Sequence, residues 1–146
     1  VSSTQGHQLM HQHPFAEQRF IQANENISKI KEILKNGSLT EFCELVELEA
    51  LSLHAMMMTS SPSFILMKPN TLNIIEKIRA FREQKNIPVC FTLDAGANVH
   101  LLFPNTYQQA VEEFVKEELV AYCEKQQYIC DKVGQGPKLL RNEVRR

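Results

Sequence analysis

The chain has 146 residues, a formal net charge of −1 at pH 7, and a hydrophobic content of 43%. This length is typical of one domain, and the apolar fraction is sufficient for a core. The near-neutral charge excludes a basic nucleic-acid-binding surface, and no apolar run is as long as a membrane span. We therefore expect one domain that binds neither nucleic acid nor membrane.

The four cysteines form no CxxC pair; they are Cys43, Cys90, Cys123 and Cys130. Three of them lie within apolar patterns, so we interpret the set as buried free thiols in a reducing compartment. No segment resembles a signal peptide. Together these features predict a cytoplasmic protein.

The segment before Phe15 is polar and rich in Ser, Gln and His, which predicts a loop. His7 and His11 are four residues apart, a spacing that would place both on one face of a helix. The segment has no helical apolar period, however, and no Cys or carboxylate completes the four ligands of a structural zinc site. We predict a surface loop, which also includes His13, and no metal site.

A helical period begins at Phe15 and ends at Gly37, a residue suited to a helix C-cap. Its apolar stripe contains Phe20, Ala23, Ile27, Ile30, Ile33 and Leu34. Ser38 and Glu41 then have the spacing of a capping box at the start of a second helix. Because the connection is short, the two helices are predicted to form an antiparallel hairpin.

Met56, Met57 and Met58 end the second helix, and three adjacent residues cannot all face one side of it. At least one methionine is expected to face a second element or a cleft, with core filling the commoner use. A third helix follows and stops at Asn86 and Pro88. Its inward residues are predicted to be Leu72, Ile75, Ile78 and Phe81.

Alternation of apolar and polar residues predicts two antiparallel strands, at 89–93 and 99–103. His100 is expected to fill a face of this sheet. Thr106 is predicted to cap a fourth helix, and residues 128–133 are predicted to form a further strand. About four helices and three or four strands without strict alternation favour an α+β domain of two layers, with helices on one face of an antiparallel sheet.

Asp94 lies in the turn between the two predicted strands, where the sheet would hold its backbone while its side chain faces a cleft. A carboxylate so placed could orient or deprotonate a substrate hydroxyl. The alternative is that Asp94 only caps the turn, which is ordinary chemistry for an aspartate close before a glycine. Spacing alone leaves both possibilities open.

Four motifs, in this order along the chain, resemble the C-terminal half of diphosphomevalonate decarboxylases, members of the GHMP kinase superfamily. Val1-Ser2-Ser3-Thr4-Gln5-Gly6 is similar to the Ser-Ser-x-x-Gly entry to the second domain of that family, and His54-Ala55 ends a helix before a proline-containing loop. Phe91 to Asn98 resembles the strand and Asp-Ala-Gly-Pro-Asn turn of the family. Gly134-Gln135-Gly136-Pro137 resembles its C-terminal end.

The resemblance implies a ferredoxin-like GHMP kinase C-terminal domain over residues 1–146, with the N-terminal nucleotide-binding domain outside this chain. It implies that the parent enzyme uses ATP and Mg²⁺ to convert mevalonate 5-diphosphate into isopentenyl diphosphate, carbon dioxide, ADP and phosphate. Asp94 would then face the C3 hydroxyl of the substrate, and Ser3 and Ser2 would contact it near the diphosphate. His54 and Asn98 would support the site without touching the reacting atoms.

Two positions depart from the family pattern: His7 replaces a methionine that is common after the motif glycine, and Ala97 replaces the proline of the turn. Neither change removes a catalytic group, but both put substrate preference in question. No Gly-rich phosphate loop occurs in the chain, so alone it is expected to be inactive. The interface to the missing domain is expected to expose apolar surface and to favour a homodimer.

Two other functions compete with this one. A mevalonate kinase-like enzyme of the same superfamily would phosphorylate its substrate without decarboxylation. A non-catalytic α+β interaction module would use Asp94 only to stabilise the turn.

Overall fold

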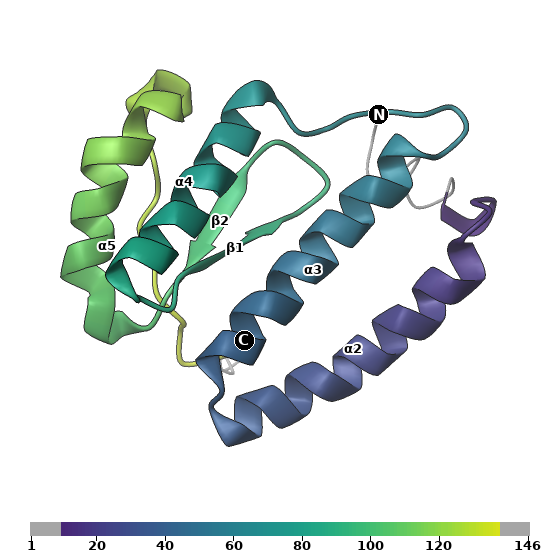
Figure 1. The fold of residues 1–146 in the computed structure, drawn as a ribbon, viewed down its shortest axis with the longest axis horizontal. Coiled ribbons are helices and arrows are strands. Elements are labelled where there is room, and N and C mark those ends of the chain that lie inside the picture. The colour runs from purple at the N-terminus through teal and green to yellow at the C-terminus, as the bar shows by residue number, and fades with distance from the viewer. Residues whose placement is uncertain (1–9, 138–146) are drawn as a thin grey trace, which may run out of the picture.

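The computed structural model describes residues 10–137 and has helices packed on a two-stranded antiparallel sheet (Figure 1). In chain order the main elements are α2 (Ala16–Asn36), α3 (Leu39–Met58), α4 (Pro69–Lys85), β1 (Cys90–Leu93), β2 (Val99–Leu102) and α5 (Gln108–Phe114). The predicted two-layer α+β class is confirmed. None of the described helices combines the length and the apolar character needed to cross a membrane.

α2 and α3 form the predicted antiparallel hairpin at one side of the molecule (Figure 1). Gly37 joins them with a left-handed φ of 72°, and its N–H donates to the Ile33 carbonyl at 2.9 Å. The predicted capping box at Ser38 is wrong: its side chain makes no capping bond, and its carbonyl only accepts the first helical bond, from the Phe42 N–H. The residue spacing was suitable, but spacing does not determine the serine rotamer.

The apolar stripe of α2 is only partly covered. Phe20, Ile27 and Leu34 remain 42%, 51% and 65% exposed, and the buried residues of the helix are Ala16 and Asn26. α2 lies at the edge of the molecule, and α3 is its main neighbour (Figure 1). An outer helix with one main neighbour buries only the part of its stripe that faces that neighbour.

The main core lies between α4, the β-hairpin and α5. Ile75, Ile78 and Phe81 of α4 pack against Phe91 and Leu93 of β1, as their spacing predicted. The rings of Phe81 and Phe114 stack with their centroids 4.1 Å apart, which ties α5 to α4. Leu72, predicted to face inward, is half exposed, and in the first turn of α4 the neighbouring Thr71 is the buried residue. Asn86 ends the helix in the left-handed region at φ 53°, as predicted.

Two predicted elements after β2 differ in the structure. A 3₁₀ turn at Asn105–Tyr107 precedes α5, and the cap position belongs to Pro104, so Thr106 does not cap a helix. Residues 128–133 form no strand, since Ile129 and Val133 are 94% and 98% exposed. An alternating pattern becomes a strand only where a neighbouring edge and a covering layer are present, and the described residues supply neither here.

Other side chains correct the sequence interpretation. His100 is exposed and does not fill a covered face of the sheet. His13 is buried instead of lying in a surface loop, and its Nε2 is 2.8 Å from Thr59 Oγ1. Cys43 and Cys90 are buried as predicted, but Cys123 is partly exposed and Cys130 is exposed.

Candidate functional site

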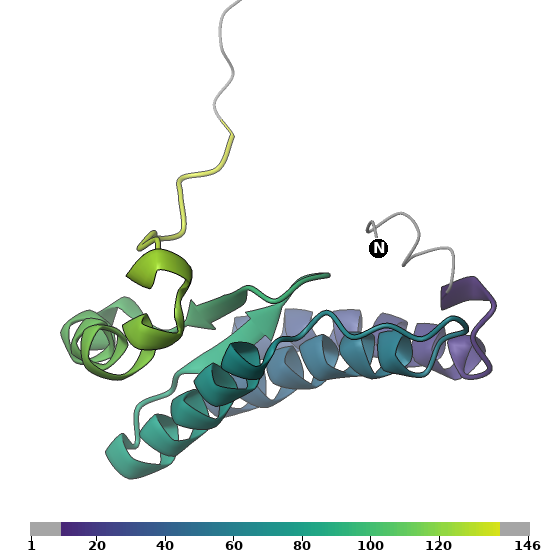
Figure 2. The ribbon, with the colours of Figure 1, turned by 90° about the horizontal axis from the view of Figure 1, so that it is seen from above.

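Asp94 begins the turn 94–98 that joins β1 to β2, and its side chain is exposed. Figure 2, turned by 90° from Figure 1, shows the hairpin over α4, with no described helix above the turn. The residue also shapes the turn, because Oδ1 accepts the Ala95 N–H at 2.7 Å and its carbonyl accepts the Gly96 N–H at 2.6 Å. The turn-capping role and the accessible carboxylate therefore coexist.

His54 anchors the start of this turn from α3. It is 1% exposed, and its Nε2 lies 3.1 Å from the backbone carbonyl of Asp94. A carbonyl can only accept a hydrogen bond, so Nε2 carries the proton and donates it. His54 thus holds the backbone of Asp94 and does not present Nε2 as a base.

Thr71 anchors the other end of the turn, a contact that the sequence analysis missed. This residue of α4 is 2% exposed, and its Oγ1 donates to the carbonyl of Ala97 at 2.9 Å. The same oxygen accepts the Lys68 N–H at 3.1 Å. A threonine near a helix start after proline indicates a cap, but nothing in the sequence indicates which distant carbonyl it also reaches.

Of the remaining predicted site residues, the structure describes Asn98 but not the two serines. Ser2 and Ser3 lie outside the described residues. Asn98 is exposed at the end of the turn, and no hydrogen bond joins its side chain to another described residue.

Met10 is buried with Met56 and Met57 in a cluster against which Ala95 packs, so the chain enters the described fold beside the Asp94 turn. Two of the three adjacent methionines thus fill a core, and Met58 is partly exposed.

A buried ion pair joins the two helices that anchor the turn. Glu47 of α3, nearly buried, accepts from both terminal nitrogens of Arg82 of α4, at 2.5 and 3.3 Å. The hydrogen bonds to Glu47 raise the pKa of the Arg82 guanidinium above its ordinary value. Arg82 also donates to the Val89 carbonyl at 2.9 Å, just before β1. One guanidinium thus links α3, α4 and the approach to β1.

Two buried thiols lie beside this pair. A hydrogen bond with Cys43, and burial, raise the pKa of Cys90, whereas that bond and the nearby Arg82 lower the pKa of Cys43. Because the thiolate is the reactive form, the strand thiol of Cys90 is expected to be inert, as the sequence analysis anticipated.

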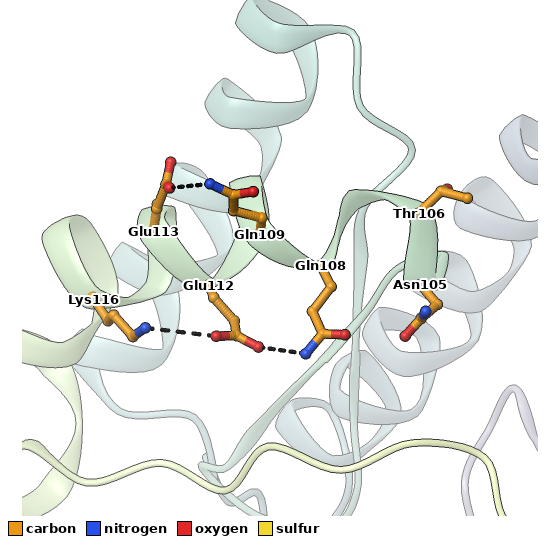
Figure 3. Close-up of a pocket in the computed structure, with 7 residues that line it drawn as sticks. All are labelled: Asn105, Thr106, Gln108, Gln109, Glu112, Glu113 and Lys116. Carbon is orange, nitrogen blue, oxygen red and sulfur yellow. Dashed lines mark hydrogen bonds and ion pairs between the residues drawn. The ribbon is translucent and has the colours of Figure 1, made fainter.

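A shallow hollow on α5 is a weaker candidate for a site (Figure 3). Its charged and amide side chains bind one another along the helix, with Gln108 donating to Glu112 at 2.7 Å and Gln109 to Glu113 at 3.1 Å. Pairs four residues apart are typical of a solvated helix surface. The hollow shares no residue with the Asp94 turn, and no group of three metal-ligating side chains occurs among residues 10–137.

The family model described as "Mevalonate 5-diphosphate decarboxylase C-terminal domain" matches residues 1–141. The chain belongs to this family. The match covers nearly the whole sequence, including the segment with Ser2 and Ser3 and the turn with Asp94. It confirms the family resemblance read from the four motifs.

Relatives agree with this assignment. A phosphomevalonate decarboxylase of Haloferax volcanii is 30% identical over 105 residues, which are 72% of this chain and 31% of that protein. A mevalonate diphosphate decarboxylase structure from Legionella pneumophila matches with a TM-score of 0.78 and 29% identity, over 84% of this chain and 39% of that one. The complex of MDDEF with MVAPP, AMPPCP and magnesium matches with a TM-score of 0.75 and 27% identity, over 81% of this chain and 36% of that one.

The chain spans roughly a third of the length of these relatives. Family membership and fold therefore apply to the chain itself, and the activity of the whole protein is a separate question.

Proposed function

We propose that this chain is the C-terminal, substrate-side domain of an ATP-dependent diphosphomevalonate decarboxylase. The main support is the Asp94 turn: in a member of this family, an exposed carboxylate sits on a backbone that two helices hold by hydrogen bonds. The parent enzyme would convert mevalonate 5-diphosphate and ATP into isopentenyl diphosphate, carbon dioxide, ADP and phosphate. A nucleotide-binding N-terminal domain would complete it, and the isolated chain would be inactive.

Asp94 would act on the C3 hydroxyl of the substrate. A tertiary alcohol is a weak nucleophile, and a carboxylate within hydrogen-bonding reach takes or directs its proton as the oxygen attacks the γ-phosphorus. ATP supplies the phosphoryl group, which turns the C3 oxygen into a leaving group. Loss of carbon dioxide from the neighbouring carboxylate then provides the electron pair of the new double bond as phosphate departs.

Ser3 and Ser2 are proposed to bind the substrate near its diphosphate, since hydroxyls donate to phosphate oxygens without adding charge. Met10, seven residues after Ser3, is buried in the cluster that also packs against Ala95, which supports this arrangement. His54 would hold the Asp94 backbone, and Asn98 would close the turn. We propose that ATP and Mg²⁺ bind mainly to the N-terminal domain of the parent enzyme, which corresponds to the part of the relatives that this chain does not cover.

The decisive test is carbon dioxide release by the full-length protein with Asp94→Asn. We expect turnover to fall by about a thousandfold or more, because the general acid–base contribution is commonly 10²–10⁴-fold. Asp131→Asn is the matched control, since Asp131 is also exposed and also accepts the N–H of the next residue at 2.7 Å. Equal rates in the two variants would remove Asp94 from the chemistry.

The identity of the substrate is a second question, because the Haloferax relative is named a phosphomevalonate decarboxylase. Mevalonate 5-phosphate and mevalonate 5-diphosphate should be compared at equal concentration. A phosphorylated acid that accumulates without carbon dioxide would favour the mevalonate kinase-like alternative. An Asp94→Ala variant that loses stability but no measurable activity or partner binding would favour the interaction module.

Two further proposals concern assembly and location. The exposed apolar residues of α2 support a homodimer, since contiguous apolar surface is typical of interaction sites. The free cysteines of the described residues, with Cys43 and Cys90 in contact, support a reducing, cytoplasmic location.

A further inference from the structure

We propose that Thr71 is a positioning residue for Asp94, and that it works with His54 to hold the turn 94–98 from both ends. The inference rests on the proposed function, because it assumes that Asp94 carries the chemistry. It adds a residue that none of the sequence motifs contains.

The first observation is the placement of the Thr71 hydroxyl. Its single proton goes to the Ala97 carbonyl at 2.9 Å, and one lone pair accepts the Lys68 N–H at 3.1 Å. The side chain is 2% exposed, so water does not compete for these bonds. A hydroxyl has one donor, and here that donor is committed to the turn.

The second observation is that packing reaches only one side of the turn. Ala95 packs against the cluster of Met10, Met56 and Met57, whereas a Cβ atom added to Gly96 would meet nothing within 4 Å. Glycine allows the widest range of backbone angles, and Ala97 lacks the ring with which a proline would fix φ at this position. Asp94 itself is exposed. The hydrogen bonds at the two ends fix the backbone from which the carboxylate projects, and the Ala95 N–H, which donates to Asp94 Oδ1 at 2.7 Å, orients the carboxylate itself.

The third observation is that the anchors come from different helices. His54 of α3 holds the carbonyl of Asp94 at 3.1 Å, and Thr71 of α4 holds that of Ala97. α3 and α4 are joined to each other by the Glu47–Arg82 ion pair. Two helices that are linked to each other therefore hold the two ends of the turn. A reacting group supported in this way stays within a fraction of an ångström of its productive position.

The test measures kcat and KM of the full-length protein with Thr71→Val and Thr71→Ser. Valine keeps the shape but removes the donor, so we expect kcat to fall about tenfold to hundredfold, since displacements near 1 Å cost that much. KM should change less than about twofold, because no substrate-binding group is altered. Serine should restore most of kcat.

Ser28→Ala is the control for the loss of a hydroxyl away from the turn. Ser28 of α2 also donates its hydroxyl to a backbone carbonyl, that of Asn24 at 3.3 Å, and it does not contact the turn. This variant should leave kcat unchanged. If Thr71→Val does not fold, His54→Leu and His54→Gln give the same comparison at the other anchor, with glutamine retaining an N–H donor.

A double mutant separates this proposal from the proposed function. If Thr71 acts through Asp94, Thr71→Val should not lower the residual rate of Asp94→Asn any further. An inactive Asp94→Asn with a normal Thr71→Val, or a Thr71→Val that lowers stability and raises KM without rescue by serine, would overturn the positioning role alone. A fully active Asp94→Asn would overturn both. Faster amide exchange at residues 94–98 in Thr71→Val, with α4 unchanged, would support the anchor independently of activity.

Discussion

The two sides of α3 meet their neighbours in different ways. Toward β1 and α4 the helix packs an apolar core around one buried ion pair, and His54 reaches the Asp94 turn from this side. Toward α2 the contact includes a partly buried polar cluster, in which Glu49 accepts from Arg19 at 2.6 Å and from the buried Asn26 at 2.6 Å. The first side determines the site geometry, and the second attaches an outer helix to it.

Substitutions on the two sides of α3 should therefore destabilise different numbers of elements. Loss of a buried charge partner affects every element that the charge contacts, whereas the loss of a partly exposed partner is offset in part by water.

Arg82→Met should destabilise α3 and α4 by about 3 kcal/mol, because it leaves the Glu47 carboxylate buried with only the weaker contact to Arg79. Hydrogen exchange of α3 and α4 in the full-length protein would measure this locally. Lys77→Met, also on α4, breaks only the exposed pair with Glu118 of the segment after α5 and should hardly change stability. If both variants accelerated amide exchange in α3 and α4 equally, the Glu47–Arg82 pair would contribute no more to stability than the exposed pair.

Glu49→Gln should destabilise α2 by about 1 kcal/mol at neutral pH and leave exchange in β1 unchanged. Burial raises the pKa of the Glu49 carboxyl, but hydrogen bonds from Arg19 and Asn26 outweigh it and the net pKa lies below its ordinary value. A lowered carboxyl pKa stabilises the fold above the unfolded value, which is about 4.3, and that stability disappears as the pH falls through the folded value.

The amide hydrogens of α2 should exchange faster in Glu49→Gln than in the wild type at neutral pH. This difference should disappear in acid, once the exchange rates are corrected for their intrinsic pH dependence. Glu32→Gln, in the exposed pair with Lys35, is the control and should show almost no difference at any pH. A difference that persists at a pH where the Glu49 carboxyl is protonated in both the folded and the unfolded state would contradict the assignment to the carboxylate charge.

Ile27→Glu should hardly change stability, since this side chain of α2 is already half exposed. If the apolar stripe forms the dimer contact, the variant should raise the dimer dissociation constant by about tenfold or more, equivalent to 1.4 kcal/mol. Sedimentation equilibrium of the full-length protein would measure this. Ser28→Glu adds the same charge beside the stripe and should leave association intact; a monomeric wild type would end the homodimer proposal.

Alkylation of the cysteines should follow burial without disturbing the fold. Iodoacetamide should modify exposed Cys130 first and Cys90 last, because burial and the bond with Cys43 keep Cys90 protonated. Mass spectrometry of timed samples would give the order. Early modification of Cys90 would mean that the α3–β1 contact opens readily.

The sequence by itself determined the elements whose signals are local. Gly37 and Asn86 end helices because a left-handed residue is needed there, and the period of Ile75, Ile78 and Phe81 predicts the buried face of α4. The four motifs also identified the family, and the turn with Asp94 lies where alternation placed it. Such features depend on residues a few positions apart.

Only the tertiary structure decided which distant groups meet. His54 lies 40 residues from Asp94 and Thr71 lies 26 residues from Ala97, and no periodicity encodes such pairs. The structure likewise left residues 128–133 without a strand and the α2 stripe uncovered, because burial and strand pairing require a neighbour that a local pattern cannot specify. The anchors of the candidate site belong to this second class, since a hydrogen bond between two helices and a turn exists only after all three have packed.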